Sequence, residues 1–116
     1  MANYWKLFKQ AKAFYFSLNK IRCPALGGKE IIFDQRGFRH FLLKKKGKRP
    51  IPDQIRRFKL LSKIKTSLEK VVVFGKEEKE GAYFWSLVHA TETGSVTIVV
   101  LENSGNYYFI SIMDRT

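Results

Sequence analysis

The chain has few of the residues that build covalent or metal-bound frameworks. Its 116 residues include one cysteine, Cys23, and two histidines, His40 and His89. One thiol cannot form an internal disulfide, and the set is too small for an ordinary structural zinc site. The sequence therefore excludes a disulfide scaffold and a zinc finger.

Long hydrophobic runs are also missing. A membrane-spanning helix needs about 20 consecutive apolar residues, and the N-terminal stretch 3–21 is interrupted by four lysines. We therefore expect neither a membrane anchor nor a secretion signal in this chain. Apolar residues make up 45% of the chain and aromatic residues 15%, which suffices for the core of one small domain.

Acidic residues are scarce, and the imbalance is concentrated in the middle of the chain. Twenty-two Lys and Arg residues against ten Asp and Glu residues give a net charge of +12. Residues 36–70 hold thirteen basic residues against two acidic ones, a net charge of +11. Such a block attracts polyanions, of which nucleic-acid phosphates are the most common. An anionic membrane surface and an acidic protein are the alternatives that charge leaves open.

The N-terminal segment has the spacing of an amphipathic helix. Apolar residues recur at steps of three and four over about residues 3–20. The positions predicted on its buried side are Trp5, Phe8, Ala11, Phe14 or Tyr15, and Leu18. Pro24 and the Gly27-Gly28 pair end this helix, and residues 31–33 form a short extended piece.

The basic middle segment predicts two further helices. Asp34 is a suitable N-cap for a helix over about residues 35–46, which Gly47 ends. The residues predicted on its buried side are Phe38, Phe41 and Leu42. A third helix begins at Pro52 or Asp53 and reaches about Glu69. Its apolar stripe consists of Ile55, Phe58, Leu61, Ile64 and Leu68.

After Lys70 the pattern changes to the two-residue alternation of strands. Strands are expected at residues 71–74, 82–91, 95–101 and 106–112, with glycine-containing turns before the last two. The order predicts an α+β fold, with N-terminal helices packed on a roughly four-stranded antiparallel sheet. Residues 1–116 form one domain in this prediction. Its parts are an N-terminal helix and connector (1–30), a basic helical region (31–70) and the sheet (71–116).

The most informative polar cluster lies on the second predicted helix. Arg36, His40 and Lys44 are spaced four apart, so they share one face of that helix. A histidine flanked by cations loses basicity, and its neutral form can take a proton from a ribose hydroxyl near pH 7. The alternative is a histidine on an ordinary solvated basic face.

Three arginines follow in the connector and the third helix. Arg49 and the pair Arg56 and Arg57 offer guanidinium groups that bind phosphate in a bidentate manner. Successive helix positions are about 100° apart, so one of the pair points elsewhere. We favour Arg57 for the site, because its stem can lie against the junction of helix and sheet. The alternative is that all three are ordinary exposed arginines.

The predicted strands carry aromatic and polar side chains on defined faces. Tyr83, Trp85 and His89 share one face of their strand, and Phe109 and Ser111 share one face of the last strand. Aromatic rings can stack on unpaired bases, and a serine can bind a phosphate. The alternative for the aromatic residues is packing in the core. His89 is either a second acid or base group or a structural residue.

The sequence offers no motif for several other chemistries. It has no phosphate-cradling glycine loop, no paired carboxylate in an apolar setting and no ligand set for a catalytic metal. If the protein cuts nucleic acid, we expect it to do so without a metal or another cofactor. This requirement indicates RNA, whose 2′-hydroxyl is a built-in nucleophile.

The stretch from residue 31 onward resembles a known family. It begins Ile-Ile-Phe-Asp-Gln-Arg-Gly-Phe-Arg-His-Phe, continues through Arg49-Pro50 and Ile55-Arg56-Arg57-Phe58-Lys59-Leu60-Leu61, and closes with a Tyr-Phe-Ile-Ser-Ile strand. This pattern is similar to the barnase/EndoU/colicin/RelE superfamily of small metal-independent RNases. It resembles above all the C-terminal toxin domains of bacterial contact-dependent growth inhibition systems.

The resemblance implies roles for individual residues. His40, which follows Gly37-Phe38, would act as general base or acid. Arg49 and Arg57 would stabilise charge on the phosphate, and Ser111 would position it. The further residues predicted to contact RNA are Arg36, Lys44, Lys46, Arg56, Tyr83 and Trp85.

The resemblance also implies a reaction and its partners. RNA, most commonly tRNA near the anticodon, would be cut to a 2′,3′-cyclic phosphate and a 5′-hydroxyl. An acidic immunity protein would cover the basic surface. The chain would be the catalytic part of a longer secreted or cell-surface effector that reaches the cytoplasm of a target bacterium. The alternatives are a non-catalytic RNA-binding module and a basic adaptor that docks on an acidic protein.

Overall fold

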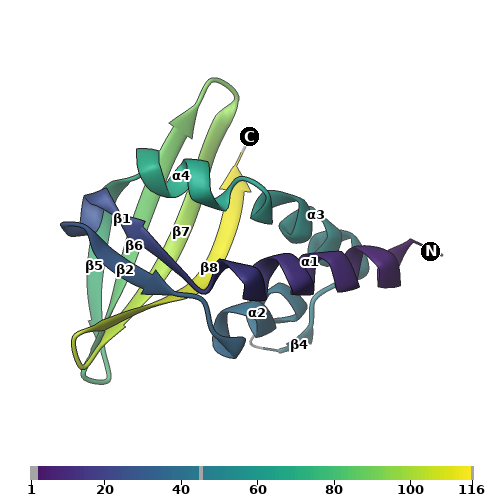
Figure 1. Cartoon of the computed structure of the whole chain (residues 1–116), viewed down its shortest axis with the longest axis horizontal. Coiled ribbons are helices and arrows are strands. Elements are labelled where there is room, and N and C mark those ends of the chain that lie inside the picture. Colours follow the sequence, from purple (N-terminus) through teal and green to yellow (C-terminus); the bar gives the residue numbers. More distant parts are fainter. Residues whose placement is uncertain (1–2, 45, 116) are drawn as a thin grey trace.

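Helices and a large sheet make up the fold in the computed structural model, which describes residues 3–44 and 46–115 (Figure 1). Its helices are α1 (Tyr4–Leu18), α2 (Gln35–Leu42), α3 (Ile51–Leu61) and α4 (Ile64–Lys70). The strands of the large sheet are β1 (Lys20–Cys23), β2 (Lys29–Ile32), β5 (Val72–Lys79), β6 (Ala82–Thr91), β7 (Gly94–Asn103) and β8 (Asn106–Arg115). The predicted α+β class, with N-terminal helices packed on a sheet, is confirmed.

The sheet is larger than predicted and is mixed. Its six strands follow the order β1-β2-β8-β7-β6-β5. Strands β5 to β8 form the expected antiparallel meander, but β2 runs parallel to β8 and β1 pairs with β2. The prediction of a roughly four-stranded antiparallel sheet is therefore wrong. Strands β1 and β2 have four residues each, too few for a clear alternation, and Ile31 pairs with the distant Tyr107.

A bulge in β8 reverses the expected direction of its last side chains. Val99 pairs with Ser111 but Val100 pairs with Phe109, which leaves Ile110 as the extra residue. A bulge shifts the alternation by one position. Phe109 is consequently buried in the helix-facing core, whereas Ser111 lies on the opposite face of the sheet. The prediction that these two residues share a face is wrong.

Helix α2 begins as predicted and ends earlier. The Asp34 side chain accepts a hydrogen bond from the Arg36 amide at 3.1 Å, which confirms the N-cap. The helix ends at Leu42 rather than near residue 46, because the chain forms a small hairpin of β3 (Leu43–Lys44) and β4 (Gly47–Lys48). The hairpin brings the Arg49 amide to within 2.8 Å of the Leu42 carbonyl, which satisfies one terminal acceptor of α2.

The long third helix of the prediction is two helices. It breaks at Ser62 and Lys63, where the Lys63 amide donates to the Leu60 carbonyl at 2.9 Å. Four residues of the predicted stripe, Phe58, Leu61, Ile64 and Leu68, are buried, and Ile55 is half-buried. Because the chain turns at the break, α4 reaches β1 and β6 while α3 lies against α1 and β8 (Figure 1).

Helix α1 buries the predicted stripe at Ala11, Tyr15 and Leu18, but it leaves Trp5 exposed. Trp5 is 64% exposed and Phe14 is 39% exposed, whereas Tyr15 is fully buried. Aromatic residues at three successive positions, 14 to 16, allowed two stripes, and the tertiary contacts select Tyr15. Its ring packs on Phe33 and Phe109, and its hydroxyl donates to the Asp34 carbonyl at 2.7 Å.

Gly37 permits the close approach of α2 to α1 and β8. A β-carbon at this position would lie 2.5 Å from the Phe109 carbonyl oxygen and would collide with the Tyr15 hydroxyl. Both groups are held by the core, so neither can move away without disturbing it. The position of α2 on β8 therefore requires a residue without a side chain at position 37.

We expect Gly37→Ala to lower the free energy of unfolding by about 2–3 kcal/mol or more, because it overpacks this contact. Urea denaturation followed by circular dichroism measures the change. Gly75→Ala is the matched control, since a β-carbon there meets no atom within 4 Å. Equal stability of the two variants would show that α2 does not depend on the close approach.

Candidate functional site

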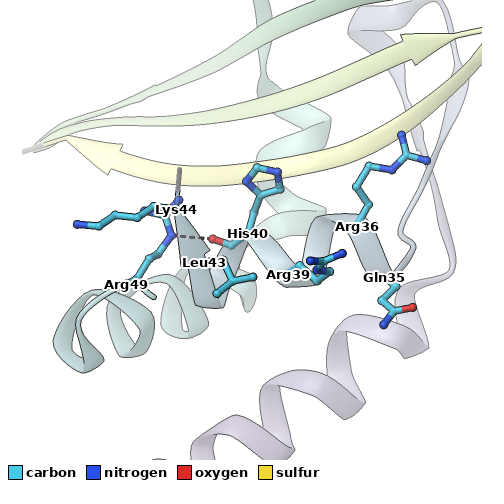
Figure 2. Close-up of a pocket in the computed structure, with 7 residues that line it drawn as sticks. All are labelled: Gln35, Arg36, Arg39, His40, Leu43, Lys44 and Arg49. Carbon is cyan, nitrogen blue, oxygen red and sulfur yellow. Dashed lines mark hydrogen bonds between the residues drawn. The ribbon is translucent and has the colours of Figure 1, made fainter. Parts of the chain in front are cut away.

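The exposed face of α2 borders an open hollow of about 760 Å³. The residues that line it are Gln35, Arg36, Arg39, His40, Leu43, Lys44 and Arg49 (Figure 2). Helix α2 buries Phe38 and Phe41 in the core, so its polar positions face outward. Figure 2 shows Arg36 and His40 directed toward β8, and Gln35, Arg39 and Leu43 on the other side of the helix. Four Lys and Arg side chains and one histidine thus surround one opening.

Arg36 fastens the start of α2 to the sheet. Its guanidinium lies 4.7 Å from the centre of the Tyr108 ring, and its terminal nitrogen is 3.6 Å from the Asp34 carboxylate. The predicted grouping of Arg36, His40 and Lys44 on one side of the helix is only partly reproduced, because Lys44 belongs to β3. Lys44 and Lys46 are both exposed.

Arg49 connects the hollow to the start of α3. Its Nε donates to the His40 carbonyl oxygen at 2.7 Å, and its terminal nitrogen lies 3.4 Å from Asp53. These two contacts fix the guanidinium at the C-terminal end of α2, where a cation also interacts favourably with the helix dipole.

Asp53 gathers three arginines. Its carboxylate lies 3.4 Å from Arg49, 2.8 Å from Arg56 and 3.5 Å from Nε of Arg57. Sequence reasoning assigned no role to this residue beyond the start of the helix. The spacing was a usable signal, because Arg49, Arg56 and Arg57 stand four before, three after and four after Asp53.

Arg57 lies at the junction of helix and sheet, as predicted. It is buried, and its terminal nitrogen donates to the Ile112 carbonyl of β8 at 3.0 Å. Arg56 is the more exposed of the pair and lies 3.8 Å from Asp114. The two adjacent arginines therefore both reach β8, one from within the fold and one from its surface.

The arginines change the pKa values of the groups between them. Burial lowers the pKa of His40 below its usual 6.5, and the charges of Arg49, Arg57 and Arg39 lower it further. Burial raises the pKa of Asp53, but the Arg56 hydrogen bond and the three arginine charges outweigh this effect and leave the pKa below its usual value. At pH 7 the site thus contains a neutral imidazole and a charged carboxylate.

Three predicted site residues do not line this hollow. Ser111 is on the sheet face that points away from the helix-covered core. Tyr83 and Trp85 are on the helix-facing side, because Trp85 pairs with the buried Val100. The expectation that these aromatic residues and Ser111 line one cleft is therefore not met.

Tyr83 and Trp85 already have partners on that side of the sheet. The Lys76 ammonium lies 4.2 Å from the Tyr83 ring centre and 4.6 Å from that of Trp85. The Trp85 indole donates to Glu102 at 2.9 Å. His89 lies further along the same face, paired with Val96, and is separate from His40.

Comparisons with known proteins return no match, whether with family models, curated proteins or solved structures. No helix among residues 3–44 and 46–115 is long and apolar enough to cross a membrane. The same residues contain no group of three or more His, Cys, Asp or Glu side chains arranged to hold a metal ion.

We expect Asp53→Asn to lower the free energy of unfolding by about 1–3 kcal/mol, because it leaves the buried Arg57 without its anion. Chemical denaturation at pH 7 measures the loss. Glu69→Gln, at an exposed position of α4, is the control and should change stability by less than about 0.5 kcal/mol. Equal losses in the two variants would contradict the role of Asp53.

We expect Arg49→Gln to raise the pKa of His40 toward 6.5, because Arg49 is the neighbouring charge that lowers this pKa most. The imidazole signals in an NMR titration report this pKa directly. Lys65→Gln, an exposed change on α4, should leave it where it is. A His40 pKa that is the same in both variants would show that Arg49 does not act on the imidazole.

Proposed function

We propose that the protein is a metal-independent endoribonuclease. The observation that carries the proposal is the position of His40 beside an open hollow lined by Arg36, Arg39 and Arg49. Burial and the neighbouring arginines lower the His40 pKa, which favours the neutral imidazole at pH 7. A neutral imidazole can accept a proton, and fixed guanidiniums stabilise negative charge on a phosphate. The high positive charge of residues 36–70 favours RNA as the polyanion that enters.

In the proposed reaction, RNA supplies the nucleophile. His40 takes the proton of a ribose 2′-hydroxyl, and the 2′-oxygen attacks the adjacent phosphorus. The bond from phosphorus to the 5′-oxygen breaks, and a water molecule that enters the hollow protonates that oxygen. The hydroxide that remains takes the proton from His40, which restores the neutral imidazole and the water. The products are a 2′,3′-cyclic phosphate and a 5′-hydroxyl, and no metal ion takes part.

The arginines have two different roles in this proposal. Arg49 and Arg39 stabilise the charge that develops on the phosphate. Arg57 is buried and paired with Asp53, so it does not bind the phosphate directly. Its positive charge lowers the pKa of His40 and attracts the phosphate from a distance.

The substrate and biological role are proposed on the family resemblance. We propose that the RNA is a tRNA cut near its anticodon, and that the domain acts as a toxin delivered into a target bacterium. Its producer would be protected by an acidic immunity protein bound over the basic region. The charge of that region supports a polyanionic partner of either kind.

We expect His40→Ala to reduce the rate of RNA cleavage by about 100-fold or more, because the reaction loses its base. Purified protein is incubated with total bacterial RNA in EDTA, and fragments are resolved on a denaturing gel. His89→Gln, which changes the other histidine, is the matched control and should cleave at a rate close to that of the unaltered protein.

Two results would contradict the proposed function. Equal cleavage by the His40→Ala and control proteins would remove His40 from the reaction. RNA that is bound but stays intact with the unaltered protein would indicate a non-catalytic RNA-binding module.

A further inference from the structure

Helix α1 presents a stripe of aromatic and basic side chains to solvent. The stripe consists of Trp5, Lys9, Lys12 and Phe16, all of which are exposed. At about 100° per residue these four positions lie within about 60° of one another around the helix axis. Trp5 is 64% exposed and Phe16 is 41% exposed, although each ring edge touches the core aromatics Phe8 and Phe38. The aromatic–lysine stripe thus has rings at both ends and two cations between them.

All the charged side chains of the helix that carries this stripe are positive. Helix α1 carries three lysines and no acidic residue. Exposed large aromatic side chains are costly in water when nothing covers them, and here two of them occur on one line. The combination of stacking surfaces and cations is the chemistry that recognises unpaired nucleotides, since bases stack on rings while lysines contact phosphates.

The Phe16 end of the stripe lies next to helix α2, which carries His40. The Phe16 ring lies 5.8 Å from the Phe38 ring, and Phe38 is two residues before His40 on α2. In Figure 2 the side of α2 that carries Gln35 and Arg39 faces away from β8, and α1 runs beyond that side. Arg39 lines the hollow on that side, so a strand that leaves the hollow toward α1 passes this cation.

An anionic membrane surface fits the stripe less well than RNA does. A helix that binds at a membrane interface inserts a wide apolar face. The wide apolar face of α1 is already used, because Ala11, Tyr15 and Leu18 are buried in the core. What remains is single rings separated by lysines along about 16 Å of helix, a length that matches a few nucleotides.

We propose that the aromatic–lysine stripe binds a single-stranded segment of the same RNA whose phosphodiester reaches His40, which makes it a second contact for substrate outside the catalytic hollow. This inference rests on the proposed endoribonuclease function. The stripe holds long RNA substrates and takes no part in the chemical step.

The test compares a long structured RNA with a dinucleotide that is too short to reach α1. The double variants Trp5→Ser/Phe16→Ser and Lys9→Gln/Lys12→Gln should raise KM for the long RNA by about tenfold or more, with kcat unchanged. Neither should alter cleavage of the dinucleotide. Matched controls are Phe74→Ser, an aromatic that is 79% exposed on β5, and Lys29→Gln/Lys79→Gln, which changes two exposed lysines on β2 and β5 outside the basic region 36–70.

A binding measurement separates this inference from the proposed function. The His40→Ala protein is titrated with the same RNA at several salt concentrations. Loss of both stripe lysines should lower the slope of log affinity against log salt by about 0.7 per lysine. Stripe-dependent binding without any cleavage by the unaltered protein would support the stripe and overturn the endoribonuclease.

Two outcomes would overturn the stripe instead. Unchanged KM and affinity in both double variants would remove it while leaving the endoribonuclease intact. Stripe-dependent binding to vesicles of anionic phospholipid, with no effect on RNA, would assign the stripe to a membrane surface.

Discussion

The contact between Asp53 and its three arginines joins the parts of the molecule that carry the candidate site. Arg49 comes from the connector, Arg56 and Arg57 from α3, and the last two also reach β8. Through Arg49 the same network holds the end of α2, where His40 lies. Without a central anion these guanidiniums would repel one another at close range. The Asp53 carboxylate therefore offsets the repulsion among the three arginines that lie closest to it.

The positively charged side chains near the hollow are of two kinds: arginines that are paired with Asp53, and cations that are not. Arg49 and Arg57 are engaged by Asp53 and stay fixed, so they lower the pKa of His40 without moving. Arg39 and Lys44 take part in none of the ion pairs found in residues 3–44 and 46–115, and both border the hollow. The fixed arginines set the electrostatic field of the site, and Arg39 and Lys44 can bind an anion directly. Such a site suits a phosphate on which charge develops during reaction.

Much of this fold follows from local patterns in the sequence. The N-cap at Asp34, the buried face of α2 and the strand β6 over residues 82–91 match the expected positions. The parallel pairing of β2 with β8 was not predicted, and the choice between Phe14 and Tyr15 was left open. Both are set by contacts between distant residues, which local periodicity does not contain.

The candidate site was predictable in part for the same reason. Spacing placed His40 and Arg36 on α2 and Arg57 at the sheet, and the structure places them there. Ser111 was misplaced because one bulged residue, Ile110, reverses every side chain after it. The role of Asp53 was readable from its spacing to the arginines, whereas its link to His40 through Arg49 required the fold.

The most direct test of the account is the chemistry of the RNA ends. RNA fragments produced by the unaltered protein in EDTA are analysed by mass spectrometry. The account predicts 2′,3′-cyclic phosphate on one fragment and a 5′-hydroxyl on the other, because the ribose hydroxyl is the nucleophile. Fragments with a 3′-hydroxyl and a 5′-phosphate would contradict it, since they require attack by water rather than by the 2′-oxygen.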